Sequence, residues 1–128
     1  MGEGVLIAPF GARSGAMHCE DVPAAEIARA AGTPTYVYSA AAIRDRYRRL
    51  AAALSGIPAR VHYSCKANGN RAILGLLRSM GSGVDVVSGG ELAKALRAGF
   101  GPGDIVQGGE GKTVAELRDG VTAGVKVI

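Results

Sequence analysis

The stretch that decides the fold is residues 61–68, with the sequence VHYSCKAN. Side chains alternate across a β-strand with a period of two, so a strand here would carry His62, Ser64 and Lys66 on one face. The intervening residues form a more apolar face that is expected to pack against covering helices. The polar face therefore needs surroundings that tolerate polarity.

Around this stretch, short apolar runs alternate with segments of helical spacing, at about 20 residues per unit. Repeated strand–helix units with short connections predict a parallel sheet with right-handed crossovers, in either a doubly wound sheet or a β/α barrel. Periodicity does not choose between the two. Strands are expected at residues 60–65, 84–87, 105–107 and 126–128, and helices at 71–80, 90–98 and 114–123.

The N-terminal region carries weaker signals. Residues 1–17 have no clear period and are expected to form an extended arm with one short strand at residues 5–8. Asp21 is expected to cap a helix that ends at Gly32, and residues 35–38 are expected to form a strand.

A second helix is expected between a cap at Ser39 and a stop at Gly56 and Pro58. It carries the densest basic cluster of a chain whose formal net charge is +4. Because the cluster also holds an acid and only one aromatic side chain, it indicates a solvated helix face rather than a nucleic-acid surface. Its basic residues are Arg44, Arg46, Arg48 and Arg49.

The composition, 48% apolar and 20% charged, indicates a soluble globular protein. We expect a cytoplasmic location and no membrane partner, because the sequence contains neither a signal peptide nor an apolar stretch near the roughly 20 residues of a membrane span. Cys19 and Cys65 are expected to be free thiols, and no metal site is expected because His18 and His62 are isolated. A hydrolase dyad of His62 with Ser64 lacks a third, orienting group.

Lys66 is the first candidate for chemistry. At the carboxyl end of a barrel strand, where enzymes of that fold keep their active sites, partial desolvation would raise the fraction of reactive amine and favour imine formation. The alternative is a lysine at the solvated end of a strand. In the next predicted strand, Asp85 lies on the face opposite Val84 and Val86. It is either an acid beside Lys66 or a strand-end acid paired with a surface arginine.

Two glycine-rich turns are candidate anion sites. Residues 88–91, SGGE, precede a helix and could turn backbone N–H groups toward an anion, but a plain helix cap by Ser88 or Gly89 is favoured. Residues 108–113, GGEGKT, end like a phosphate loop, yet the GxxxxGK[ST] pattern needs glycine where Val106 stands. Nucleotide triphosphate binding is therefore rejected.

Residues 63–70, YSCKANGN, resemble the YAVKANSN motif around the Schiff-base lysine of the diaminopimelate decarboxylases. Residues 81–92 resemble the second barrel strand of that family, and residues 108–113 resemble the GxxKT turn after its third. Upstream, residues 18–23 and 32–38 resemble the N-terminal segments of that family. These blocks occur in the family's order and spacing, so the combination is more specific than any one of them.

The resemblance implies an α/β fold, the N-terminal part (about half) of a parallel, TIM-type β/α barrel like that of alanine racemase, with the C-terminal β-domain absent. It implies an N-terminal arm over residues 1–22 and an incomplete cofactor-binding barrel domain over residues 23–128. It also implies that Lys66 is the catalytic residue that holds pyridoxal 5'-phosphate, that Asp85 is a second cofactor-binding residue, and that Glu91 lies in or near the active site.

For the full-length enzyme, the resemblance implies decarboxylation of meso-2,6-diaminopimelate to L-lysine by a homodimer that takes a small amino-acid substrate and binds no nucleic acid. The alternatives are a related ornithine or arginine decarboxylase, an alanine racemase-like enzyme, or a non-catalytic half-barrel. The chain stops inside an apolar run at residues 125–128, which predicts a fragment that is inactive alone. The chain departs from the family's pattern at four positions, and these departures are expected to affect packing more than chemistry. They are Ser64, Cys65, Gly69 and Gln107.

Overall fold

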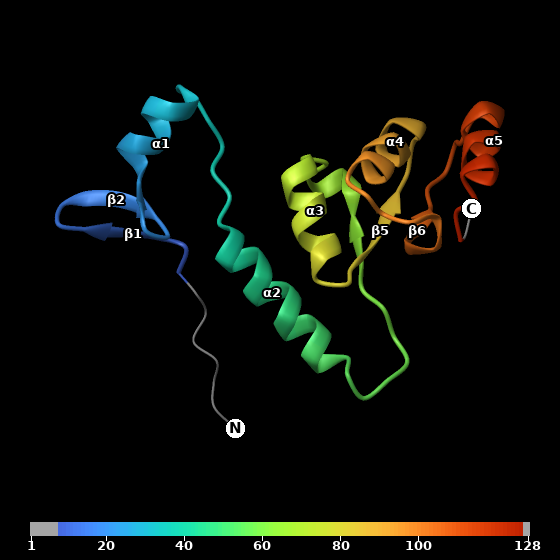
Figure 1. Cartoon of the computed structure of the whole chain (residues 1–128), viewed down its shortest axis with the longest axis horizontal. Coiled ribbons are helices and arrows are strands. Elements are labelled where there is room, and N and C mark those ends of the chain that lie inside the picture. The colour runs from blue at the N-terminus through green and yellow to red at the C-terminus, as the bar shows by residue number, and fades with distance from the viewer. Residues whose placement is uncertain (1–7, 127–128) are drawn as a thin grey trace. The chain divides into compact units, whose positions relative to one another are not determined.

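A computed structural model of the chain describes residues 8–126. The chain divides into two compact units, Met1–Arg49 and Leu50–Ile128, which are described separately (Figure 1). Helix α2 (Ala40–Ala53) contains the boundary between them.

The first unit holds a small antiparallel sheet where the sequence predicted an extended arm. Strand β1 (Phe10–Arg13) pairs with β2 (Ala16–Cys19), which pairs with β3 (Val22–Pro23). Ser14 and Gly15 connect β1 to β2, both with positive φ, as tight hairpin turns require. The strand expected at residues 5–8 lies largely outside the described residues, and Ala8 is not in a strand.

Helix α1 (Ala24–Ala31) follows β3 directly. Its end at Gly32 is confirmed, but the predicted cap is wrong. The N-cap position is Pro23, and no side chain caps the helix there. Asp21 lies in the turn between β2 and β3, where its carboxylate accepts a 2.7 Å hydrogen bond from Arg13.

The strand expected at residues 35–38 is also absent from the structure. Thr35, Tyr36 and Tyr38 have the β-branched and aromatic side chains that favour strands, but strand propensity depends on a partner and a surface to pack on. No strand among residues 8–126 pairs with this segment, and the Tyr36 side chain is 92% exposed.

The cap of α2 is confirmed and is stronger than predicted. The Ser39 hydroxyl oxygen accepts the N–H of Ala42 at 3.0 Å. Glu20 Oε1 accepts the N–H of Ala41 at 2.9 Å and the Ser39 hydroxyl at 2.7 Å. The Ala41 N–H, followed by the Ser39 hydroxyl, lowers the pKa of Glu20 below its ordinary value. The four arginines of this helix are exposed, as expected.

The second unit contains the predicted parallel sheet, ordered β4 (His62–Ser64), β5 (Gly83–Val86) and β6 (Ile105–Gln107). Helices follow the strands in turn and confirm the α/β alternation. They are α3 (Arg71–Ser79), α4 (Gly89–Arg97) and α5 (Val114–Ala123), with a short 3₁₀ helix η2 (Pro102–Asp104) before β6. The strand expected at residues 126–128 falls largely outside the described residues.

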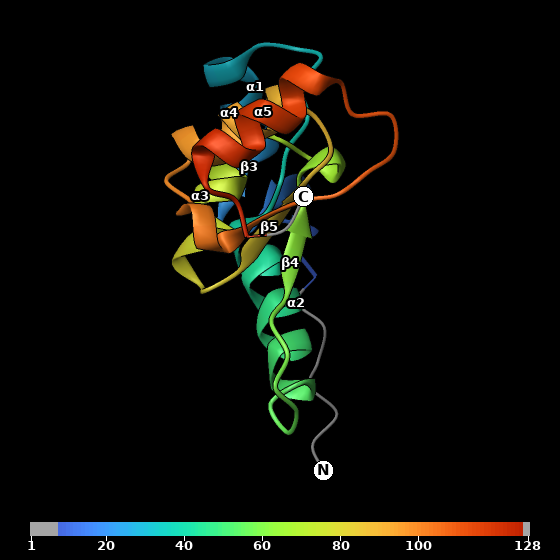
Figure 2. The same cartoon turned by 90° about the vertical axis from the view of Figure 1, so that its right-hand side faces the viewer.

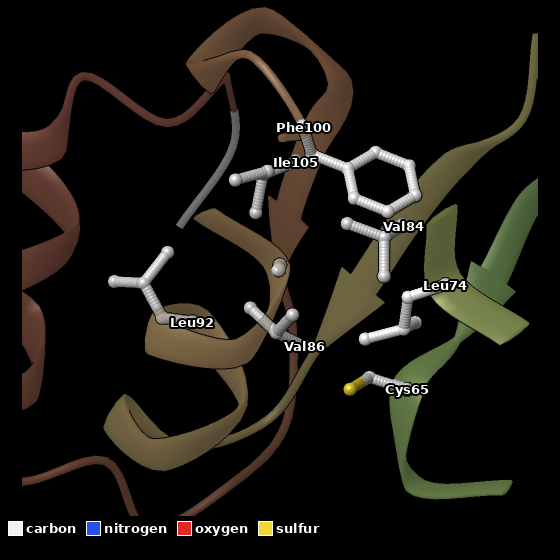
Figure 3. Close-up of a cluster of buried hydrophobic side chains, with 8 residues drawn as sticks. Cys65, Leu74, Val84, Val86, Leu92, Phe100 and Ile105 are labelled. Atoms are coloured by element: carbon white, nitrogen blue, oxygen red, sulfur yellow. The ribbon is translucent and has the colours of Figure 1, made fainter. Parts of the chain in front are cut away.

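The core of this unit lies on one face of the sheet. Val84 and Val86 of β5 and Ile105 of β6 pack against Leu74 of α3 and Leu92 of α4 (Figure 3). Helices α3 and α4 contact the sheet, and α5 packs beside α4 (Figure 2). None of the helices among the described residues is both long enough and apolar enough to cross a membrane. The alternate positions on the strands point to the other face, which carries His62, Ser64 and Asp85 together with Val106, whereas the polar Gln107 is buried on the core side in register with Val86.

Candidate functional site

Lys66 lies just beyond the strand on which the sequence placed it. Strand β4 ends at Ser64, and Cys65–Ala67 form a 3₁₀ turn, η1. The face alternation therefore holds for His62 and Ser64 but not for Lys66, because the pairing of β4 with β5 stops at Ser64. The correction moves Lys66 from a strand face to the turn at the carboxyl end of β4.

The turn η1 is anchored while its lysine stays accessible. Cys65 is 1% exposed and belongs to the hydrophobic core, so its thiol holds the turn against the unit. Burial raises the pKa of the Cys65 thiol, which keeps it in the uncharged form at neutral pH. Lys66 is exposed, and no hydrogen bond or ion pair engages its ammonium within residues 8–126. The partial desolvation expected for Lys66 is therefore not found among residues 8–126, and the exposed side chain agrees with the alternative of a lysine at the solvated end of a strand. The turn fixes the backbone of Lys66 and leaves its amine available.

Asp85 lies on the adjacent strand, level with the end of β4. Its register partner is Ser64, and the Ser64 hydroxyl donates a 3.1 Å hydrogen bond to Asp85 Oδ2. The alternative of an acid paired with a surface arginine is wrong within the described residues. Arg60 instead pairs with Asp104 at 2.7 Å, and this hydrogen bond lowers the pKa of Asp104.

A glycine makes room for the same carboxylate on its other side. Gly108 directly follows β6, and a Cβ atom at this position would lie 3.0 Å from Asp85 Oδ1. Few real Cβ contacts are that short. Ser64, Asp85 and Gly108 therefore form a row across the carboxyl ends of the three strands, and only glycine leaves the carboxylate undisturbed in its observed position.

His62 occupies the start of the same polar face. Its ring lies over Gly83, the register partner, so closely that any Cβ at residue 83 would collide with it. Its Nδ1 atom is 3.4 Å from the carbonyl oxygen of Arg60, and its buried Nε2 atom has no hydrogen-bond partner. Because the Ser64 hydroxyl is engaged by Asp85, the structure contains no His62–Ser64 dyad.

The turn after β5 is a helix cap, as favoured from the sequence. The Ser88 hydroxyl oxygen accepts the N–H of Glu91 at 3.2 Å, and Glu91 Oε2 accepts the N–H of Val87 at 2.9 Å. The N–H of Gly89 donates to Glu116 Oε1 at 3.1 Å. The protein's own side chains therefore use amides that an anion would need, and Glu91 lies at the beginning of α4.

The segment 108–113 leads into the cap of α5. Thr113 and Glu116 form a capping box in which Glu116 Oε2 accepts the N–H of Thr113 at 2.9 Å. This bond and the one from Gly89 lower the pKa of Glu116. Lys112 Nζ donates to the carbonyl oxygen of Gly109 at 3.0 Å. Glu116 thus ties the start of α4 to the start of α5.

Residues 8–126 contain no group of three or more His, Cys, Asp or Glu side chains that could hold a metal ion. Cys19 and Cys65 are both buried and free.

A family model described as "Pyridoxal-dependent decarboxylase, pyridoxal binding domain" matches residues 40–128, which is more than half of the chain. The chain belongs to this decarboxylase family. The matched range includes every element from α2 onward and therefore the whole row of residues at the carboxyl ends of the strands.

Individual members of the pyridoxal-dependent decarboxylases agree with this assignment. The chain is 45% identical over 116 residues to a diaminopimelate decarboxylase of Pseudomonas fluorescens, covering 91% of this chain and 28% of the relative. It resembles a crystal structure of diaminopimelate decarboxylase from M. jannaschii in complex with L-lysine, with a TM-score of 0.86 and 35% identity, over 93% of this chain and 29% of the other. A crystal structure from Aquifex aeolicus gives a TM-score of 0.85 and 40% identity over 91% and 29%. The chain thus spans just over a quarter of the length of these relatives.

Sequence reasoning missed two parts of this site. It placed Ser64 and Asp85 on polar faces of neighbouring strands but did not pair them, and it gave Gly108 no role beside Asp85. The position of these residues in the sequence could have revealed both. Each lies at or just after the end of its strand, and the carboxyl ends of parallel strands meet at one edge of a sheet.

Proposed function

We propose that Lys66 is the attachment point for pyridoxal 5'-phosphate and the catalytic lysine of a decarboxylase. The observation that carries this proposal is an exposed amine that has no partner among residues 8–126, on a turn anchored at the carboxyl end of a parallel strand. Active sites of β/α barrels gather at this end of the strands. The family description supports a pyridoxal-binding role for the matched range.

The residues present fit this cofactor. Attachment requires a free amine, because Lys66 Nζ must add to the aldehyde carbon of pyridoxal phosphate and a water molecule must leave. No ion pair or hydrogen bond has to be broken first within the described residues. The missing side chain at Gly108 keeps open the space beside Asp85 Oδ1. We infer that the cofactor is held at this edge of the sheet.

The chain's own residues would position the reaction. When bound, pyridoxal phosphate supplies an electron sink for the electron pair released as CO₂ departs. Asp85 lies on β5, the strand that contacts η1, and its carboxylate would favour a positive charge on the nitrogen that attaches the cofactor. The buried Cys65 restrains η1, so Lys66 stays at one place relative to β5.

The overall architecture is proposed on the same basis. Three parallel strands alternating with helices are consistent with part of a TIM-type barrel, in keeping with the similarity to the decarboxylase structures. The arm over residues 1–22 and the partial barrel domain over residues 23–128 stay predictions.

The activity of the whole enzyme is proposed from the relatives. We infer decarboxylation of meso-2,6-diaminopimelate to L-lysine for a protein of the relatives' length, acting as a cytoplasmic homodimer. Support comes from the names of the relatives and from the L-lysine in the M. jannaschii structure. The alternative ornithine and arginine decarboxylases resemble the chain at only 22–23% identity in the solved structures, which shows the fold alone.

Borohydride trapping tests the central claim directly. The chain is mixed with pyridoxal phosphate, reduced with borohydride, digested, and the adduct is located by mass spectrometry. We expect the adduct on Lys66 and its loss in Lys66→Arg, which keeps the charge but cannot form the attachment. Lys112→Arg is the matched control and should leave trapping unchanged. Equal labelling of all lysines, or full labelling in Lys66→Arg, would refute the proposal.

A further inference from the structure

The Ser64 hydroxyl bridges two strand ends beside the proposed cofactor site. Ser64 and Asp85 are register partners on β4 and β5, and both are half-buried. The hydroxyl donates to Asp85 Oδ2 at 3.1 Å, and it is the only hydrogen-bond donor to this carboxylate among residues 8–126. One oxygen of Asp85 is therefore held from the β4 side.

The other oxygen of this carboxylate lies on the side of Gly108. Oδ1 faces Gly108 beyond β6, at 3.0 Å from the position a Cβ would take. The Ser64 bond holds Oδ2, and the missing side chain at Gly108 leaves space beside Oδ1. Ser64 thereby binds Oδ2 of Asp85 and leaves Oδ1 available to another partner.

The position of Asp85 matters because its strand neighbours the lysine-bearing turn. Strand β5 and η1 are in contact, and η1 begins directly after Ser64. The motif that residues 63–70 resemble has alanine in place of Ser64, so the resemblance assigns no role to this hydroxyl.

We propose that Ser64 is a positioning residue that holds the Asp85 carboxylate in place for the cofactor attached to Lys66. This inference rests on the proposed function. A carboxylate held nearby stabilises positive charge on the attached nitrogen, whereas one that can rotate away stabilises it less. Removing the hydroxyl therefore makes the attached nitrogen lose its proton at lower pH.

The test follows the absorbance of the cofactor-loaded chain as a function of pH. In Ser64→Ala we expect the midpoint of the absorbance change to fall by roughly half a pH unit. Ser64→Thr keeps the hydroxyl and should restore the midpoint. Ser79→Ala is the matched control, since it removes an exposed hydroxyl that donates only to the Leu76 carbonyl. In an Asp85→Asn background, Ser64→Ala should shift nothing further.

A second measurement separates this inference from the proposed function. Unfolding of the cofactor-free chain by urea gives a double-mutant cycle between Ser64→Ala and Asp85→Ala, for which we expect a coupling of roughly fivefold in the unfolding equilibrium constant. If no adduct forms on Lys66, the proposed function fails for this chain. If the effects of the two substitutions on unfolding are additive, the contact between Ser64 and Asp85 is overturned as well. An unchanged midpoint in a loaded Ser64→Ala chain overturns the role of Ser64 while the proposed function stands.

Discussion

The two faces of the sheet β4-β5-β6 are built from alternate residues of the same strands, yet they differ in chemistry. One face packs Val84, Val86 and Ile105 against helices, and all three side chains are fully buried. The opposite face carries Ser64 and Asp85, which are half-buried and bonded to each other. Burial of apolar area stabilises the unit through the first face, so the second face is free to carry polar groups.

This difference teaches that stability and chemistry can be perturbed separately in this unit. Changes on the helix-facing side should alter unfolding without altering the preference of the cofactor for Lys66. Changes on the polar side should alter the absorbance of the loaded chain and have smaller effects on unfolding. The following predictions test that separation, from the largest expected effect on stability to the smallest.

Leu74→Ala removes a fully buried side chain of α3 from the core. We expect a loss of about 3 kcal/mol in the free energy of unfolding, because the cavity adds to the lost burial. Urea denaturation measures it, and Leu96→Ala on α4, where the side chain is 39% exposed, is the milder control. In buffer without urea, where the variant remains folded, borohydride trapping should still give the adduct on Lys66. A shift of the adduct to other lysines would contradict the separation.

Gly108→Ala tests how tightly the polar face is packed. The new methyl group would lie 3.0 Å from Asp85 Oδ1, so the carboxylate or the loop must move. We expect a loss of about 1 kcal/mol in urea denaturation, at the low end for overpacking because the site is only half-buried. Gly103→Ala is the control, since a Cβ there meets nothing within 4 Å. Equal stability of both variants would show that Asp85 is free to move.

Glu116→Gln tests the link between α4 and α5 through pH. The pKa of Glu116 in the folded chain is lowered below the ordinary 4.5 by N–H donors of Thr113 and Gly89. Its contribution to stability is therefore complete above about pH 4.5 and is lost as the pH falls through the lowered value. Thermal melts at neutral pH should show a drop of a few degrees in Tm for the variant, and the two proteins should converge in acid. A constant difference across that range would rule out the carboxylate as the cause.

Asp85→Asn should have the smallest effect on stability. The amide oxygen can still accept the Ser64 hydroxyl, so we expect a change within about 0.5 kcal/mol in urea denaturation. The charge is lost, however, so the absorbance midpoint of the loaded chain should fall at least as far as in Ser64→Ala. A large loss of stability would place Asp85 among the residues that hold the fold together.

Local signals predicted most of the second unit. Strand β6 and helix α5 have the predicted bounds, because an apolar run flanked by glycine and a threonine cap are strong boundary signals. A helix cap at Ser88 or Gly89 was also predicted, and the structure places it at Ser88. The strand at residues 35–38 was wrong because β-propensity cannot supply a pairing partner.

The sequence by itself determined that short strands alternate with capped helices, and that Lys66 lies near the carboxyl end of one of these strands. These properties depend on neighbours within a few residues along the chain. Tertiary structure decided where β4 stops, that Ser64 bonds to Asp85, and that Gly108 leaves room for that carboxylate. Each of these depends on the register between strands about 20 residues apart in sequence, which only the assembled sheet defines.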